Sequence, residues 1–297
     1  MNYILETKEL TKKYGKKLAL NGLSMHVPEK TIYGFLGVNG AGKTTTFGII
    51  GGYIKATSGT FHTQGKVSIL PQDARFYQGR KVADQLQFLA VLSGVPEKKA
   101  KKDVLRVLEA VGLHEKAQVN AEKLSHGMYK RLGIAQALLG DPDILLLDEP
   151  TSGLDPETAF ETRKLIATLG KKHTVVISSH NLTEISDLCP YIGIIHEGKM
   201  HYEGPIASLT KKGQSVTFYL SALEKLEKLK TFPWILDQHF NPLDSSLEIT
   251  FDNTQKSVEV ANEEILKYLF DKKIQVREIS LGKSLEESFL EMIKGEK

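Results

Sequence analysis

The sequence is nearly free of cysteine and has no long apolar run. Its 297 residues include a single cysteine, Cys189, so no internal disulfide can form, which is typical of a reducing compartment. We expect Cys189 to be a buried, inert thiol. No uninterrupted apolar run approaches the roughly 18 residues that span a bilayer, and the start, MNYILETKELTKKYG, lacks the basic head and apolar core of a targeting segment. Membrane association would therefore have to come from another protein.

A strong charge imbalance is also missing. The 39 basic and 36 acidic residues leave a formal net charge of +3, and the basic residues are spread along the chain. The densest basic run, EKKAKKD at residues 97–103, is flanked by acids and is typical of the solvated face of a helix. We expect neither nucleic acid nor an anionic membrane as the main partner. With 41% hydrophobic residues, the chain can bury a sizeable core in one large domain or two ordinary ones.

The apolar pattern predicts an α/β protein. Residues 3–36 alternate in short runs such as YILETKEL and LSMHV, which predicts antiparallel strands that lead into a buried strand at TIYGFLG. The spacing then becomes helical in VADQLQFLAVLSG and AKKDVLRVLEAVGL. Two continuous apolar runs, DILLLDEP and HTVVISSH, are short and rich in branched residues, as in parallel strands that are covered on both faces.

A change of pattern predicts two domains. The polar segment TKKGQ around Lys211 precedes a new strand–helix pattern, SVTFYLSALEKLEKL. We therefore expect one domain at residues 1–212 and a smaller one at 213–297. Near the end of the chain, Leu285, Phe289 and Met292 fall on one helical face. This face either packs on the small domain's own sheet or forms a surface for a dimer or a partner.

The stretch GVNGAGKTT, residues 37–45, fits the phosphate-binding pattern G-x-x-x-x-G-K-[ST] between an apolar strand and a helix. Its glycines let the backbone fold closely around phosphate with the N–H groups turned inward. Lys43 adds a positive charge for the outer phosphates, and Thr44 offers a hydroxyl to Mg²⁺ at a helix start that favours anions. The alternative is a glycine-rich turn that contains a lysine by chance. The predicted phosphate-binding residues are Gly37, Asn39, Gly40, Ala41, Gly42, Lys43, Thr44 and Thr45.

The buried strand ILLLDEP supplies the acids that phosphoryl transfer requires, because Mg²⁺ prefers hard oxygen ligands. Asp148 is the better metal-side ligand, through a water molecule. Glu149 is placed to orient or deprotonate the attacking water; the alternative is a surface acid at the end of a strand. His180 follows the strand TVVISS and is either a contact for the γ-phosphate or an ordinary core or surface histidine. The predicted catalytic residues are Lys43, Glu149 and His180.

The motifs occur in the order phosphate loop, LSHGM, LLLDEPTSGLD and SSH, and LSHGM begins 24 residues before Asp148. With this set, about residues 3–210 resemble the ATP-binding subunit of an ATP-binding cassette (ABC) transporter. The resemblance implies ATP and Mg²⁺ as cofactors. It also implies a P-loop NTPase cassette with a mixed, largely parallel core sheet, an N-terminal antiparallel β subdomain, a helical signature subdomain at about residues 80–140 and a small C-terminal α/β domain.

The same resemblance assigns further residues. It implies that adenine stacks on Tyr14, for which an ordinary half-buried strand residue is the alternative. It implies that Gln72 senses Mg²⁺ and couples to the membrane subunit, that Asp155 crosses a dimer interface, and that His180 is the switch histidine. The predicted metal ligands are thus Thr44, Gln72 and Asp148.

In this family ATP lies between the phosphate loop of one subunit and the signature of another. The resemblance therefore implies a dimer in the ATP-bound state, either a homodimer or a heterodimer with a similar cassette. Ser125 suits the N-cap of the helix HGMYKRLGIAQALLG, so that its hydroxyl and the N–H groups near Gly127 meet the partner's γ-phosphate. His126 and Met128 replace the usual glycine and glutamine, and such variants resemble the cassettes of type-2 bacterial exporters, which pair with six-helix permeases.

Two other departures touch no phosphate contact. Val38 replaces the commoner proline of the phosphate loop, which lowers the rigidity of that loop. The segment GTFHTQGKVSILPQ is shorter than usual, so we expect a trimmed antiparallel edge.

Together these features predict an ATP-hydrolysing subunit that drives a separate integral membrane permease, in export, from the cytoplasmic face of the inner (cell) membrane. The alternatives are a soluble cassette ATPase that acts on ribosomes or nucleic acid, and a docking protein with little turnover. Neither a tandem cassette nor a long heptad-rich insert is present, and Lys43, Asp148 and Glu149 are intact. The expected docking surface surrounds Gln72 and DARFYQGRKVADQL, whose Phe76 and Tyr77 either receive a short permease helix or pack locally.

Overall fold

The computed structural model describes residues 2–209, 215–221, 232–252 and 255–281. The chain divides into two compact units, Met1–Gly204 and Pro205–Lys297. The boundary expected at about residue 212 lies outside the described residues. So do the helix expected after SVTFYL and the tail residues Leu285, Phe289 and Met292.

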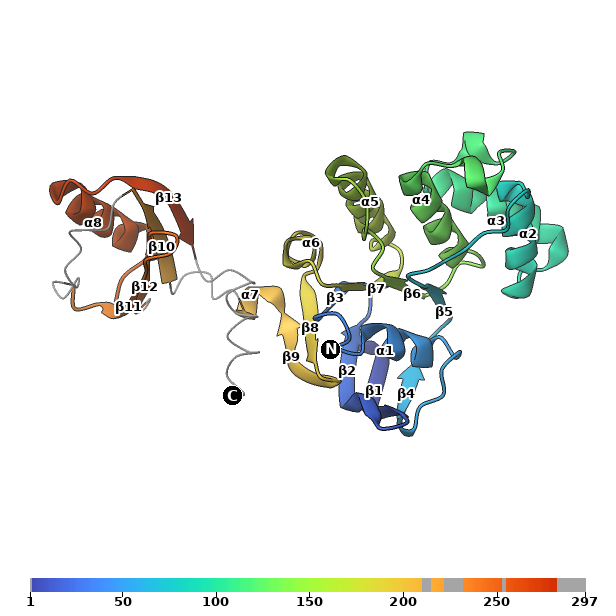
Figure 1. Cartoon of the computed structure of the whole chain (residues 1–297), viewed down its shortest axis with the longest axis horizontal. Helices are drawn as coiled ribbons and strands as arrows, with labels where there is room; N and C mark the ends of the chain where they lie inside the picture. The colour runs from blue at the N-terminus through green and yellow to red at the C-terminus, as the bar shows by residue number, and fades with distance from the viewer. Residues whose placement is uncertain (1, 210–214, 222–231, 253–254, 282–297) are drawn as a thin grey trace. The chain divides into compact units, whose positions relative to one another are not determined.

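A six-stranded sheet forms the centre of the first unit (Figure 1). Its strand order is β5-β6-β7-β3-β8-β9, and the neighbouring pairs from β5 to β8 are parallel. All residues of β6 and β7 are buried, because these branched apolar strands lie inside the sheet with both faces covered. The parallel strands expected at DILLLDEP and HTVVISSH are thereby confirmed. The bounds are β3 Ile32–Leu36, β5 Val67–Leu70, β6 Ile144–Asp148, β7 Thr174–Ser179, β8 Tyr191–His196 and β9 Lys199–Pro205.

The amino-terminal residues fold as a second, antiparallel sheet with the order β2-β1-β4. Its strands are β1 Tyr3–Tyr14, β2 Lys17–Pro28 and β4 Ser58–Thr63. The buried apolar residues of β1 and β2 share one core with α1 (Lys43–Ile50) and with residues of the central sheet. Because α1 is packed into this core, the phosphate loop that precedes it has a fixed base. The segment GTFHTQGKVSILPQ supplies β4 and β5.

Three consecutive helices, α2, α3 and α4, occupy residues 82–137 and lie at the upper right of Figure 1. Helix α3 buries Ala100, Val104, Val107 and Leu108 and leaves the lysines of EKKAKKD exposed, as the sequence predicts. Helices α5 and α6 follow β6 and β7, respectively. The bounds are α2 Val82–Leu92, α3 Glu97–Ala110, α4 His126–Ala137, α5 Pro156–Leu169 and α6 Leu182–Leu188, with short 3-10 turns at His114–Lys116 and Ala121–Lys123.

The second unit begins with the short helix α7, Ile206–Leu209, and contains a four-stranded antiparallel sheet in the order β11-β12-β10-β13. Helix α8, Val258–Asp271, buries Ala261, Ile265 and Leu269 in the core of this unit. The small α/β architecture expected for the end of the chain is therefore present. The strands are β10 Ser215–Leu220, β11 Ile235–Asn241, β12 Ser246–Phe251 and β13 Val276–Leu281.

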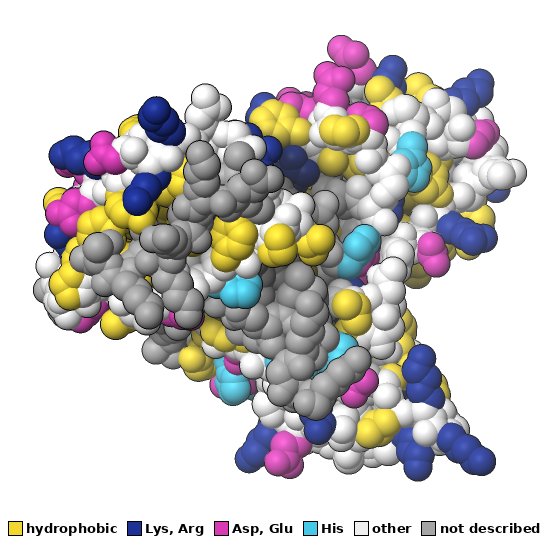
Figure 2. Space-filling view, turned by 60° about the vertical axis from the view of Figure 1, so that its left-hand side comes forward, with side chains coloured by type: hydrophobic (Ala, Val, Ile, Leu, Met, Phe, Trp, Pro, Cys, Tyr) yellow, Lys and Arg dark blue, Asp and Glu magenta, His cyan; other side chains and the backbone are white. Residues whose placement is uncertain are grey.

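The structure also bears on the expectations for Cys189 and for the surface of the protein. Cys189 is buried, and burial raises the pKa of its thiol, as expected for an inert side chain. None of the helices in the described part of the chain has the length and apolar character that crossing a membrane requires. On the face shown in Figure 2, Lys and Arg side chains are interspersed with Asp and Glu.

The buried strand β6 should carry much of the stability of the first unit. Leu146 is fully buried in the core that joins the two sheets, so Leu146→Ala should lower the free energy of unfolding by about 2–5 kcal/mol. Urea titration followed by far-ultraviolet circular dichroism measures this change. The matched control is Leu92→Ala, because Leu92 is 67% exposed, and it should change stability by no more than about 0.5 kcal/mol. Equal effects of the two substitutions would contradict the buried position of β6.

Candidate active site

The phosphate loop joins β3 to α1, and close backbone packing explains its glycines. Gly42 has a φ of 115°, and a Cβ added there would lie 2.7 Å from the carbonyl oxygen of Ala19. A Cβ on Gly37 would lie 2.5 Å from the carbonyl oxygen of Ile195. The Gly37 N–H donates to the carbonyl oxygen of Ser179 at 3.3 Å, which ties the loop to the end of β7. The loop therefore requires glycine for its shape as well as for access to phosphate.

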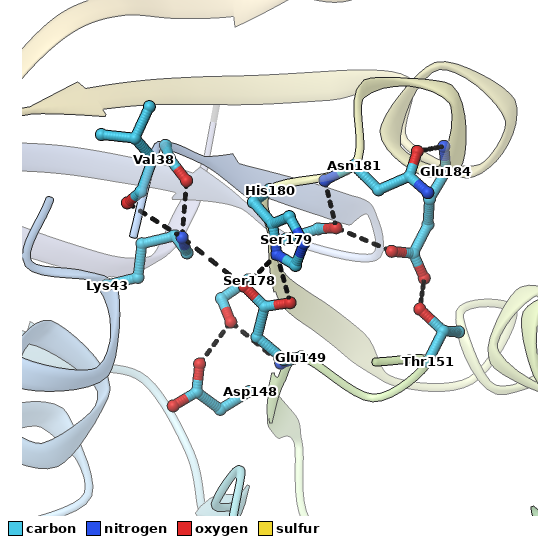
Figure 3. Close-up of polar contacts among 11 residues, drawn as sticks. Val38, Lys43, Asp148, Glu149, Thr151, Ser178, Ser179, His180, Asn181 and Glu184 are labelled. Atoms are coloured by element: carbon cyan, nitrogen blue, oxygen red, sulfur yellow. Dashed lines mark hydrogen bonds and ion pairs between the residues drawn. The ribbon is translucent and has the colours of Figure 1, made fainter. Parts of the chain in front are cut away.

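Lys43 begins α1 and places its ammonium group inside the loop. Its Nζ donates to the carbonyl oxygens of Gly37 at 2.6 Å and Val38 at 3.3 Å, and lies 3.6 Å from Glu149 Oε1 (Figure 3). Burial lowers the pKa of Lys43, and the nearby Glu149 and Asp148 carboxylates partly oppose that shift. The cation is thus held in a weakly solvated place, where it interacts strongly with anionic groups.

Glu149 and His180 form a direct pair at the ends of β6 and β7. The ring nitrogen Nδ1 of His180 lies 2.8 Å from Glu149 Oε2 and 3.0 Å from Oε1 (Figure 3). Glu149 is 6% exposed and has a φ of 50°, a left-handed conformation that is uncommon outside glycine. Such conformations persist where the surrounding structure fixes them, and they cluster at functional sites. The structure thus brings Lys43, Glu149 and His180, the three predicted catalytic residues, into one chain of polar contacts.

Asp148 has one carboxylate oxygen engaged and one free to bind a ligand. Its Oδ1 accepts a hydrogen bond from the Ser178 hydroxyl, whereas its Oδ2 is buried without a hydrogen-bond partner in the described residues. A buried unpaired oxygen is costly, so it fits a hydrated cation beside the phosphate loop. Sequence reasoning missed Ser178, which also accepts a hydrogen bond from the Glu149 N–H at 3.0 Å. The double serine of SSH was the only available signal.

Most of the predicted nucleotide-binding residues of the first strands and of the phosphate loop line one open pocket of about 380 Å³, whereas Gly37 and Ala41 are buried and do not line it. Tyr14 is 46% exposed at its edge, and the Lys12 ammonium lies 4.8 Å from the centre of the Tyr14 ring. Gln72 lines this pocket and also a neighbouring one beside α4. The lining of the first pocket includes Tyr14, Asn39, Gly40, Gly42, Lys43, Thr44, Thr45, Gln72 and Glu149.

Ser125, Gly127 and Asp155 are not among the described residues that line this pocket. Ser125 caps α4 as expected, since its hydroxyl accepts the Met128 N–H at 3.3 Å. Asp155 caps α5 by accepting hydrogen bonds from the Thr158 N–H and hydroxyl, and the Thr158 N–H is the main cause of its lowered pKa. The signature and Asp155 therefore lie outside this pocket of their own chain.

A groove of about 830 Å³ lies along the segment expected to dock a partner. The two aromatic residues of that segment behave differently. Phe76 packs locally: its ring meets Tyr129 edge-on at 5.3 Å, and its N–H donates to the Tyr129 hydroxyl at 2.8 Å. Tyr77 is 75% exposed, while its backbone N–H donates to Gln85 Oε1 at 2.7 Å. Sequence reasoning missed the roles of Tyr129 and Gln85, although both lie in the quoted segments, because nothing in the sequence shows that they contact Phe76 and Tyr77. The groove lining also includes Arg75, Gln78, Arg80, Asp84, Phe88, Leu89 and Gln136.

The fold and the site together are those of a nucleotide-hydrolysing cassette. They combine a parallel-rich sheet and a glycine-rich phosphate loop with a carboxylate pair at a strand end and a histidine paired to it. The family described as ABC transporter matches residues 20–152. The chain is 36% identical to the bacitracin transport ATP-binding protein BcrA of Bacillus licheniformis over 99% of each chain. It is 35% identical to the lantibiotic transport ATP-binding protein SrtF of Streptococcus pyogenes, over 67% of this chain and 90% of that one. The chain therefore belongs to the ATP-binding proteins of ABC transporters.

Solved structures agree with this assignment. CbiO1 of Clostridium perfringens, part of the ABC transporter complex cbiONQ, aligns with a TM-score of 0.62 at 28% identity, over 70% of this chain and 91% of that one. The ATP-binding cassette MJ1267 aligns with a TM-score of 0.64 at 22% identity, over 69% and 92%, and supports the fold alone. The protein is thus an ATP-binding, ATP-hydrolysing subunit of a membrane transport system. The alternative of a factor for ribosomes or nucleic acid is not favoured, since the relatives named above are transport subunits.

Gly127 offers a test of how the signature helix is seated. A Cβ at Gly127 would lie 2.2 Å from Thr158 Cγ2, so Gly127→Ala should strain the contact between α4 and α5 and lower stability by about 1–3 kcal/mol. Adding Thr158→Ser should restore most of this loss, because serine lacks the methyl group and keeps the hydroxyl that donates to Asp155. Thermal unfolding of both variants, with Thr158→Ser alone as control, measures the effect. A failure of the second substitution to rescue the first would contradict the proposed contact.

Proposed function

We propose that this protein binds ATP with Mg²⁺ between two copies of itself, or between itself and a similar cassette, and uses hydrolysis to drive export through a separate membrane permease. The observation that carries the proposal is the convergence of Lys43, Glu149 and His180 at the phosphate loop. The domain that does this spans residues 1–212, with residues 213–297 as an accessory domain.

Mg²⁺ would be held by the Thr44 hydroxyl, the Gln72 side chain and, through water, Asp148. The unpaired buried Oδ2 of Asp148 and the exposed position of Thr44 in the pocket support this assignment. When bound, the ion neutralises phosphate charge and fixes its geometry. In the described residues, no cluster of three or more acidic, histidine or cysteine side chains could bind the ion without the nucleotide.

Glu149 is the general base in this proposal, and His180 is its orienting partner. A base must lie within hydrogen-bond reach of the water that it activates, and Glu149 lines the pocket while its carboxylate is held by the His180 ring. Lys43 contributes positive charge that stabilises the transferred phosphoryl group. Tyr14 would stack on adenine from the edge of the same pocket.

The position of Ser125, Gly127 and Asp155 outside the pocket supports the proposed dimer. Ser125, Gly127 and Asp155 lie outside the pocket of their own chain, although the helix start capped by Ser125 presents N–H groups suited to a phosphate. A second copy in head-to-tail orientation would bring that helix start to the open side of the phosphate loop. Loss of the γ-phosphate would then remove the charge that holds the two faces together.

The groove beside Phe76 would receive a short helix of the permease. It is apolar along Tyr77, Phe88 and Leu89, and it carries Arg75 and Arg80 against a single acid, Asp84. This lining suits an amphipathic segment with an acidic end. The protein would thus sit at the cytoplasmic face of the cell membrane. Export is supported by the LSHGM variant and by relatives described as bacitracin and lantibiotic transport and linearmycin resistance proteins.

Substitution of the base tests the hydrolytic part of the proposal. Glu149→Gln keeps the shape of the side chain but cannot accept the proton of the attacking water, so it should lower steady ATP hydrolysis by at least about a hundredfold. It should also stabilise an ATP-bound dimer, which gel filtration detects. Glu161→Gln is the control, because Glu161 is half exposed on α5 and forms an ion pair with Lys164 on the same helix. Hydrolysis by Glu149→Gln at the parental rate would disprove the assignment of the base.

Docking can be tested separately from hydrolysis. Tyr77→Asp and Phe88→Asp place a charge in the groove at side chains that are 75% and 59% exposed, so the fold should tolerate them. Both should lower the amount of integral permease that is purified from membranes with this protein, while basal ATP hydrolysis stays near the parental rate. Leu105→Asp on α3, a 44% exposed position outside the groove lining, is the matched control. Undiminished permease recovery with both groove variants would contradict the docking site.

A further inference from the structure

One buried carboxylate beside the site has no part in the proposed mechanism. Glu184, in the first turn of α6, is 2% exposed. Its Oε1 accepts a hydrogen bond from the Thr151 hydroxyl at 2.6 Å, and its Oε2 accepts one from the Ser179 hydroxyl at 2.7 Å (Figure 3). No salt bridge of Glu184 occurs among the described residues, so its two oxygens are occupied by hydroxyl groups from two different segments.

Those two segments are the ones that carry the catalytic pair. Thr151 lies two residues after Glu149, and Ser179 immediately precedes His180. We propose that Glu184 is a positioning residue of the hydrolytic site, which cross-links the segment after β6 to the end of β7 and so fixes Glu149 against His180. This inference rests on the proposed roles of Glu149 and His180.

The segment after Glu149 needs such a tether. Glu149 leaves β6 in a left-handed conformation, and the following residues form local turns, in which the Ser152 N–H donates to the Glu149 carbonyl oxygen at 3.2 Å. These turn bonds do not connect the segment to β7. The hydroxyl of Thr151 does so through Glu184, which lies 33 residues further along the chain.

Hydrogen bonds to Glu184 also hold the backbone on both sides of His180. The Ser179 hydroxyl donates to Glu184 and accepts the Asn181 N–H at 3.0 Å, while Asn181 Oδ1 accepts the Glu184 N–H at 3.1 Å. The His180 side chain itself is half exposed and is anchored through Glu149. The position of His180 therefore depends on Ser179 and Asn181, which flank it, and both are hydrogen-bonded to Glu184.

The simpler alternative is that Glu184 only anchors α6. In that case its loss would loosen the first unit as a whole, and ATP affinity, thermal stability and hydrolysis would fall together. A positioning role predicts a different pattern. The phosphate loop makes no contact with Glu184 in the described hydrogen bonds, so ATP binding should persist while turnover falls.

Two mild substitutions separate these cases. Glu184→Gln keeps the side-chain volume, and Thr151→Val removes only one hydroxyl from a half-buried position. Each should lower kcat for ATP by between about tenfold and a hundredfold, the usual size for a displaced catalytic group, with ATP affinity near the parental value. Amide hydrogen exchange should become faster at residues 149–155 and 179–184. Thr162→Val is the matched control, because the buried Thr162 hydroxyl donates to the Thr158 carbonyl oxygen of the same helix, and it should leave both readouts unchanged.

The double variant Thr151→Val/Glu184→Gln should lose no more activity than the more affected single variant, because both substitutions break the same Thr151–Glu184 link. Parental kcat in both single variants, losses that multiply in the double variant, or a parallel fall of ATP affinity and thermal stability would each overturn the inference. Comparison with Glu149→Gln separates the two proposals. A large loss of turnover in Glu184→Gln together with parental turnover in Glu149→Gln would contradict only the assignment of Glu149 as the base. A large loss in Glu149→Gln together with parental turnover in Glu184→Gln would contradict only the positioning role of Glu184.

Discussion

The parallel pairing of β6 with β7 is the constraint on which the site depends. Asp148 is the register partner of Ser178, and Glu149 and His180 are the first residues after the ends of the two strands. Adjacent strands lie about 4.8 Å apart, so this pairing places the backbones of Glu149 and His180 close enough for their side chains to meet. A shift of β6 by one residue in this register would turn Asp148 away from Ser178 and move the side chains of β6 to the opposite faces of the sheet. The fully buried apolar residues of the two strands make such a shift costly.

The same sheet edge also sets the electrostatics of the site. The Glu149 carboxylate lies between the Lys43 ammonium, on the helix that follows β3, and the His180 ring, at the end of β7. A buried cation needs an anion or several carbonyl groups close by, and Lys43 has both. Burial nevertheless remains the main influence on the pKa of Lys43. Three segments far apart in sequence thus share one weakly solvated cluster, in which each charge depends on its neighbours.

The parts of this site that the sequence predicted are those whose residues lie in one contiguous motif. The phosphate loop needs glycines, a lysine and a hydroxyl at fixed spacing, and the carboxylate pair ends an apolar run, so local chemistry identifies both. Ser178, Glu184 and Tyr129 were not predicted, because their partners lie 30, 33 and 53 residues away and any polar residue of suitable length could fill those places. The different positions of the two aromatic residues of the groove could not be predicted for the same reason. Nothing in the sequence distinguished Phe76, which packs on Tyr129, from Tyr77, which is exposed.

In the proposed function, helix α4 would connect the signature with the groove that receives the permease. Its first turn is capped by Ser125, and the Tyr129 N–H donates to the Ser125 carbonyl oxygen at 2.8 Å. The hydroxyl of the same tyrosine accepts the N–H of Phe76 in the groove. One helical turn therefore lies between the signature and the groove backbone, so a permease that displaced Phe76 would also act on the helix start that carries Ser125. Coupling of this kind needs only a displacement of one packed helix, since close-packed elements move as units rather than deform.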